Sequence, residues 1–160
     1  MKVRSIASLT FPLMVALATA CTPGASLPTT AAIATQTGAP ATVIDVNLTL
    51  NPAGNVPAGA GGGYKPLAVS IARGSFVQFQ NSDGFAHTAT SISGTTFPSA
   101  YPFTSAALTA SGGTLSGGFS TGNLVAGSTS APILADVAGR YIYGCFYHYG
   151  TPMRAEIDVH

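Results

Sequence analysis

Residues 141–153 read YIYGCFYHYGTPM and place three metal-binding side chains, Cys145, His148 and Met153, within a span of nine residues. Their spacing is C-x2-H-x4-M. A thiolate and a thioether favour copper in its cuprous state, whereas an imidazole suits either oxidation state. The stretch therefore predicts a copper site that still lacks one ligand.

The fourth ligand must come from elsewhere in the chain. Only two other histidines are present, His87 in the segment NSDGFAHTAT and His160 at the last position. We expect His160 to be solvated on a terminal strand, which leaves His87 as the candidate. The site would then join two distant segments, and it requires folding to bring the imidazole of His87 to Cys145 and His148.

The ligand stretch lies between two strand patterns. Apolar and other residues alternate over 141–144 and again over 155–160, as in strands with one buried face. Gly150 and Pro152 are turn formers, so we expect a short loop between these strands. Such a loop has little freedom to relax. Its rigidity would suit electron transfer, because rearrangement between two oxidation states slows that step.

Two segments of the sequence resemble the cupredoxins, the small blue copper proteins of the plastocyanin and azurin type. AGRYIYGCFYHYGTPMRAEIDV, residues 138–159, resembles their copper-binding end. KPLAVSIARGSFVQFQNSDGFAHTAT, residues 65–90, resembles the segment that carries their first histidine. In this chain Thr88 follows His87, where many cupredoxins have an asparagine that ties the two copper-binding loops together.

The resemblance implies an all-β fold, a Greek-key β-sandwich of eight strands or so. It implies one copper ion with His87, Cys145 and His148 as strong ligands and Met153 as a weak axial ligand. The protein would then be a one-electron carrier, with copper alternating between Cu(I) and Cu(II), and not an enzyme.

The resemblance also implies how such a carrier meets its redox partners. His148, on the exposed loop, would be the route of the electron. Tyr147 and Tyr149 would belong to an apolar face on which partner proteins dock transiently, and the carrier itself would be a monomer.

Residues 1–20 have the pattern of a signal peptide, with a basic start, an apolar run over 6–20 and small residues at the end. The run is too short and wrongly flanked for a stable spanning helix. Ala18-x-Ala20 suits ordinary signal peptidase, whereas small residues ending in Cys21 resemble the lipobox of bacterial lipoproteins, whose cysteine carries lipid. Both outcomes predict export to the periplasm or cell envelope, with any membrane attachment through the lipid alone.

Residues 21–41 are rich in Ala, Thr and Pro and have the composition of a linker. Residues 42–160 are then expected to form a single all-β domain. Alternating apolar residues predict one half-buried strand over 43–50 and two more strands at 67–71 and 76–80, the latter two joined by a turn.

Residues 91–127 are rich in Gly, Ser and Thr and carry no charge. We expect a long surface loop there with one or two irregular strands. Beyond residue 20 the chain has four basic and five acidic side chains, a net charge of −1. This balance gives no footprint for nucleic acid and predicts weak electrostatic steering, so partner recognition would use apolar and aromatic surface.

Several alternatives compete with the blue copper interpretation. Zinc accepts one cysteine and two histidines, although a thioether is a poor zinc ligand. A cysteine hydrolase would need a helix N-terminus or a cation beside Cys145, and the sequence indicates neither. Cys145 could also be a structural thiol, or pair with Cys21 if that residue carries no lipid. The functional alternatives are a protein that buffers or delivers copper outside the cytoplasm and a metal-free β-sandwich scaffold.

Overall fold

The computed structural model describes residues 41–49 and 61–160. The predicted signal peptide, Cys21 and nearly all of the predicted linker lie outside the described residues. Within the described ranges, no helix is long and apolar enough to cross a membrane. The one helical element found there is a short 3-10 helix, η1 (Ser105–Leu108).

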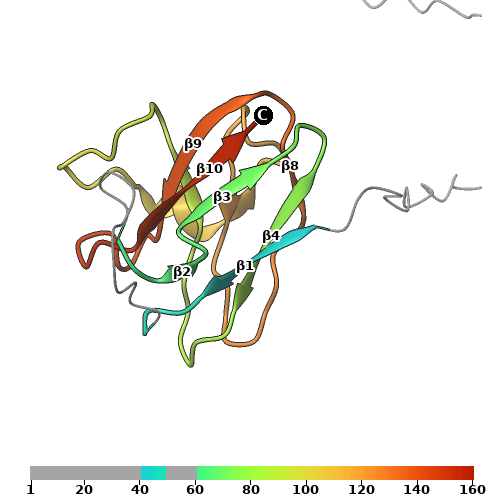
Figure 1. Ribbon diagram of the computed structural model, residues 1–160. Helices are drawn as coiled ribbons and strands as arrows, with labels where there is room; N and C mark the ends of the chain where they lie inside the picture. Colours follow the sequence, from blue (N-terminus) through green and yellow to red (C-terminus); the bar gives the residue numbers. More distant parts are fainter. Residues whose placement is uncertain (1–40, 50–60) are drawn as a thin grey trace, which may run out of the picture. The chain divides into compact units, whose positions relative to one another are not determined.

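Ten strands in the described residues form two sheets (Figure 1). The first sheet has the order β2-β1-β4-β8, with β1 parallel to β4 and the other pairs antiparallel. Its strands are β1 (Thr42–Val46), β2 (Tyr64–Lys65), β4 (Phe76–Asn81) and β8 (Ile133–Leu134).

The second sheet has the order β3-β10-β9-β5-β7-β6, with β3 parallel to β10 and the other pairs antiparallel. The predicted all-β sandwich is therefore confirmed. The strands of this sheet are β3 (Ala68–Ile71), β5 (Thr90–Ile92), β6 (Ala110–Ser111), β7 (Ser120–Thr121), β9 (Gly139–Gly144) and β10 (Arg154–Val159).

The core lies between the sheets and follows from the alternation of apolar residues along the strands. Val77 and Phe79 of β4 are fully buried, as is Ile157 of β10. Each such side chain contributes about 1.5–3 kcal/mol relative to an exposed one. Tyr64 and Tyr143 pack edge to face with ring centroids 4.9 Å apart, so aromatic side chains from both sheets meet beneath the end that carries Cys145.

The predicted turn at Arg73-Gly74 joins two strands that belong to different sheets. Gly74 has a φ of 89°, which glycine adopts without strain, and its N–H donates to the carbonyl of Ala135 over 2.8 Å. The chain thereby passes from β3 to β4 without pairing them. Both strands instead take parallel partners, as Figure 1 shows.

Strand β1 is shorter than the predicted strand over 43–50. It ends at Val46 because the side chain of Asn47 accepts a hydrogen bond from the N–H of Thr49 over 2.9 Å, which turns the chain. Leu48 therefore lies in a turn, and the prediction of a strand position for it is wrong. Leu50 lies outside the described residues.

Segment 91–127 contributes more to the fold than the predicted surface loop. It contains β6, β7, η1 and most of β5, and it buries Leu115, Phe119 and Leu124. The two strands that lie wholly within it, β6 and β7, have two residues each and agree with the predicted one or two irregular strands. The buried side chains contradict the rest of the prediction, a surface loop. The segment forms one edge of the second sheet and part of the core.

Candidate metal centre

The pairing of β5 with β9 brings the two predicted ligand segments together. Thr90 lies opposite Gly144 in an antiparallel register. Cys145 directly follows β9, and His87 lies three residues before β5. The same register, continued past the strand ends, places the segment of His87 beside the ligand loop.

Three candidate ligand atoms converge at this point. Sγ of Cys145 lies 3.7 Å from Nδ1 of His87 and 3.6 Å from Nδ1 of His148, and a ligand atom of each residue lies within 4.8 Å of the others. His87 and Cys145 are fully buried, whereas His148 is half-buried.

The separations of these atoms fit a bound transition-metal ion. Bonds of about 2.0 Å to nitrogen and about 2.3 Å to sulfur, at roughly 120°, hold the two atoms about 3.7 Å apart. The distances from Cys145 to both histidines agree with this value. The set of two imidazoles, one thiolate and, on the same loop, the thioether of Met153 is the donor chemistry that copper prefers over zinc.

Backbone hydrogen bonds close the ligand loop. The N–H of Cys145 donates to the carbonyl of Met153 over 3.0 Å, and the N–H groups of Met153 and Thr151 both donate to the carbonyl of His148 over 3.1 and 3.0 Å. The loop between β9 and β10 is thus short and internally bonded, as its turn formers predict.

Met153 is fully buried at the end of this loop. It packs against Gly63, where an added Cβ would lie 2.4 Å from Cγ of Met153 and 2.9 Å from its Sδ. The contact requires glycine at position 63 and leaves the methionine side chain little room to move.

Asn81 fixes the segment that carries His87. Its buried side chain donates to the carbonyl oxygens of Phe85 and Leu124, each over 2.8 Å, and accepts from the N–H of Asp83 over 2.8 Å. The backbone of His87 exchanges two further hydrogen bonds with Leu124, over 3.0 and 2.8 Å. The 91–127 segment therefore helps to position the first histidine through Leu124.

Thr88 links the two segments directly. Its hydroxyl accepts from the N–H of Phe146 over 2.8 Å, and its own N–H donates to Sγ of Cys145 over 3.4 Å. The hydroxyl group thereby makes the connection that the resemblance assigns to an asparagine. Sequence reasoning noted Thr88 as a departure from the cupredoxin pattern and missed its role as the link.

The charge states of the candidate ligands suit a metal site. Burial raises the pKa of the Cys145 thiol, and hydrogen bonds, chiefly from backbone N–H groups, lower it only in part. Metal binding therefore has to displace a proton from the sulfur. Burial, together with the neighbouring His87, lowers the pKa of His148, so that its imidazole is neutral and available as a ligand near neutral pH.

Asp83 contacts the far side of the first histidine, with its Oδ2 3.0 Å from Nε2 of His87. Burial raises the pKa of this carboxyl, but hydrogen bonds from His87, Leu48 and Gly84 outweigh burial and bring the pKa below its ordinary value. Sequence reasoning gave Asp83 no role. Its position four residues before a candidate ligand was the available signal.

Tyr147 and Tyr149 occupy different environments, although both were predicted to lie on a docking face. Tyr147 is 44% exposed, and its hydroxyl donates to the side chain of Asn123 over 2.8 Å. Tyr149 is only 4% exposed, and its hydroxyl donates to the carbonyl of Pro98 over 2.8 Å. The prediction for Tyr149 is wrong because the 91–127 segment covers its ring.

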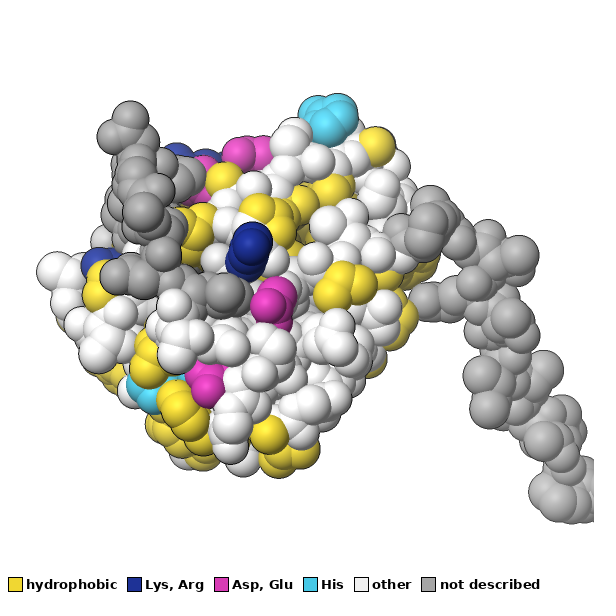
Figure 2. Space-filling view, turned by 60° about the horizontal axis from the view of Figure 1, so that its bottom comes forward, with side chains coloured by type: hydrophobic (Ala, Val, Ile, Leu, Met, Phe, Trp, Pro, Cys, Tyr) yellow, Lys and Arg dark blue, Asp and Glu magenta, His cyan; other side chains and the backbone are white. Residues whose placement is uncertain are grey.

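Aromatic side chains lie beside His148 at the surface and extend away from it. Phe85 is 48% exposed, with its ring centroid 5.7 Å from that of His148. The rings of Tyr147, Phe146 and Tyr101 continue from there, with centroids 5.3 and 5.8 Å apart. Figure 2 shows hydrophobic side chains gathered around the histidine at the lower left of the view. We call Phe85, Tyr101, Phe146 and Tyr147 the aromatic rim.

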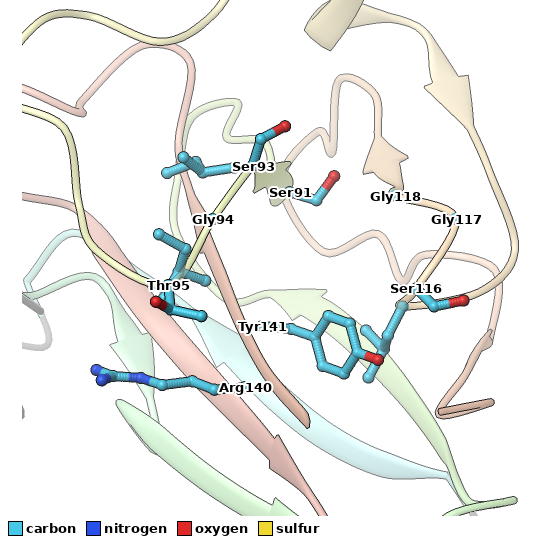
Figure 3. Close-up of a pocket in the computed structure, with 12 residues that line it drawn as sticks. Ser91, Ser93, Gly94, Thr95, Ser116, Gly117, Gly118, Arg140 and Tyr141 are labelled. Atoms are coloured by element: carbon cyan, nitrogen blue, oxygen red, sulfur yellow. The ribbon is translucent and has the colours of Figure 1, made fainter. Parts of the chain in front are cut away.

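A separate cavity of about 430 Å³ lies beside β5 and β9, and none of the four candidate ligands lines it (Figure 3). Several of its polar side chains have partners within the protein. Ser91 and Tyr141 bond to backbone carbonyls, and Arg140 pairs with the carboxylate of Glu156. The cavity therefore adds nothing to the metal centre.

Solved cupredoxins have structures similar to this one. A purple cupredoxin from Nitrosopumilus maritimus is 19% identical, with a TM-score of 0.46, over 74% of this chain and 99% of its own. A methionine-to-alanine mutant of amicyanin in its Cu(I) form is 14% identical, with a TM-score of 0.47, over 75% of this chain and 82% of its own. Oxidised plastocyanin from Dryopteris crassirhizoma is 13% identical, with a TM-score of 0.47, over 74% of this chain and all of its own. No protein-family model matches the sequence, and no curated protein matches it.

The described residues form a β-sandwich with a metal centre of cupredoxin type. The resemblance seen in the sequence is confirmed by the centre itself, because His87 of the first segment meets Cys145 and His148 of the second. Met153 closes the loop that carries the last two of these residues.

Proposed function

We propose that this protein is a type 1 copper protein that carries single electrons outside the cytoplasm. The observation that carries the proposal is the convergence of Nδ1 of His87, Sγ of Cys145 and Nδ1 of His148, whose separations fit bonds to one shared ion. Residues 42–160 would be the copper-binding domain. Copper, when bound, supplies a one-electron couple between Cu(I) and Cu(II).

The four side chains have distinct tasks in this proposal. His87, Cys145 and His148 hold the ion strongly, and Met153 is the weak axial ligand. The bonds that join Cys145 to Met153 and Met153 to His148 keep the ligands from spreading apart. Small ligand movement favours rapid electron transfer and also retention of the ion, which supports a carrier over a protein that delivers copper.

His148 is the proposed exit for the electron. It is the half-buried member of the group, and Phe85 and Tyr147 of the aromatic rim lie beside it. Transient redox encounters bury about 1,200 Å² or less, an area that such a rim and its surroundings can supply. With a net charge of −1 beyond residue 20, recognition would rest on apolar contact more than on long-range attraction.

The proposed location is the periplasm or cell envelope, which the protein would reach by export. Residues 1–20 would be removed, and Cys21 would carry lipid if the lipobox-like pattern is used. Cys145 is a free and buried cysteine. Burial in a metal centre would protect its thiol in an oxidising compartment, where unpaired thiols are uncommon.

Copper titration of the purified protein, followed by reduction and reoxidation, tests the function. We expect one copper ion per chain and repeated one-electron cycling without loss of the ion. Cys145→Ser should abolish this behaviour. His160→Ala is the matched control, because His160 is exposed and bonds to Ser70 away from the centre. Slow cycling with ready release of copper would instead favour copper delivery, and no uptake would favour a metal-free scaffold.

A further inference from the structure

The two nitrogens of His87 have different partners. Nδ1 faces Sγ of Cys145 over 3.7 Å, and Nε2 lies 3.0 Å from Oδ2 of Asp83. The imidazole is fully buried, and the side chain of Asp83 is only 9% exposed. Water therefore has little access to this contact, which makes the choice of the protonated nitrogen depend on Asp83.

The carboxylate of Asp83 is itself held in place by the backbone. Oδ2 also accepts from the N–H of Leu48 over 2.9 Å, and Oδ1 accepts from the N–H of Gly84 over 2.7 Å. The N–H of Asp83 donates to the side chain of Asn81 over 2.8 Å. Both oxygens of the carboxylate accept from backbone N–H groups, and an ionised carboxylate has no proton to donate. Towards His87 it can therefore act only as an acceptor. A proton on Nε2 satisfies that contact, and a proton on Nδ1 does not.

We propose that Asp83 is a positioning residue of the metal centre, which keeps the proton of His87 on Nε2, frees Nδ1 for the metal ion and lowers the reduction potential. Carboxylate partners of metal-bound histidines fix the tautomer and raise the basicity of the ligand. A more basic ligand with a negative charge beside it favours the more positive oxidation state. The expected effect on the reduction potential rests on the proposed copper function, whereas the tautomer of His87 is a property of the metal-free protein.

Two substitutions separate the charge of Asp83 from its hydrogen bond. Asp83→Asn removes the charge and retains an oxygen that can accept from Nε2. Asp83→Ala removes both. Asp136→Asn is the matched control, because Asp136 is another carboxylate that accepts from a backbone N–H and a side chain, those of Ser116, but it precedes the opposite end of β9.

Nitrogen NMR of His87 in the metal-free protein, with the imidazole neutral, tests the tautomer. We expect the proton on Nε2 in the unsubstituted protein and in Asp83→Asn, and a mixture of tautomers in Asp83→Ala. A proton on Nδ1 in the unsubstituted protein, or an unchanged tautomer in Asp83→Ala, would overturn the proposed positioning role. Because no copper is present, this measurement stands even if the copper function fails.

Voltammetry of the copper-loaded variants tests the potential. We expect an upward shift in Asp83→Asn, no comparable shift in Asp136→Asn, and a loss of copper affinity of about 10–100-fold in Asp83→Ala. Equal potentials in Asp83→Asn and the unsubstituted protein would overturn the effect of charge. If Asp83→Ala does not fold, Asp83→Asn and the tautomer of the unsubstituted protein still decide the proposal.

Discussion

The hydroxyl of Thr88 accepts a hydrogen bond from the N–H of Phe146 over 2.8 Å and so connects the His87 segment to the ligand loop. The backbone N–H of the same threonine donates a hydrogen bond to the sulfur of Cys145. A single threonine thereby fixes the spacing between two segments that lie 58 residues apart in the sequence.

Thr88→Val should destabilise the protein by about 1 kcal/mol, because it leaves the partly buried N–H of Phe146 without an acceptor. Thr88→Ser keeps the hydroxyl and is the control. Chemical denaturation of both variants measures the difference in the free energy of unfolding. Equal stabilities would show that the link contributes nothing.

Gly63→Ala should cost more stability than Gly94→Ala, by about 1–3 kcal/mol of overpacking. Both glycines have a positive φ, 84° and 88°, so backbone strain is common to the two variants. Only at Gly63 would the new methyl group meet Met153, since nothing lies within 4 Å at Gly94. The difference between their unfolding midpoints checks the contact, and similar losses would argue against tight packing of Met153.

Tyr149→Ala should lose about 3–5 kcal/mol of stability, as buried aromatic residues do on truncation. Tyr147→Ala should change stability by only about 0.5 kcal/mol, as exposed positions do, but should slow electron exchange with a partner because it removes part of the aromatic rim. Thermal unfolding and stopped-flow reduction distinguish the two tyrosines. The reverse pattern would contradict the assigned burial of Tyr149.

Met153→Gln should lower the reduction potential while copper remains bound, because an amide oxygen stabilises Cu(II) better than a thioether does. Voltammetry of the substituted protein measures the shift. An unchanged potential would remove Met153 from the set of ligands, although its packing against Gly63 would stand.

The sequence predicts the copper end well because the signals there are local. Donor types and spacing identify Cys145 and His148, and strand alternation around them indicates the loop that β9 and β10 form. His87 follows from the small number of histidines and from its resemblance to the first histidine of the cupredoxins. These inferences need no knowledge of contacts between distant residues.

Long-range contacts account for what the sequence does not predict. Tyr149 bonds to the carbonyl of Pro98, 51 residues earlier, and its ring packs against Phe103. An aromatic loop residue gives no local sign of such a cover. Leu124 bonds to the backbone of His87 from within a Gly-, Ser- and Thr-rich segment, whose composition resembles a surface loop. Strand β1 ends early, directly before Asn47, and this turn-forming asparagine is a local signal. The prediction of a longer strand gave more weight to the alternation of apolar residues.

Absorption and electron paramagnetic resonance of the copper-loaded protein test the metal centre most directly. If His87, Cys145, His148 and Met153 bind the ion together, Cu(II) should give the intense blue thiolate-to-copper band and the narrow copper hyperfine splitting of a type 1 site, and Cys145→Ser should lose both. A colourless protein with the spectrum of an ordinary tetragonal Cu(II) site, unaltered in Cys145→Ser, would contradict the proposed centre.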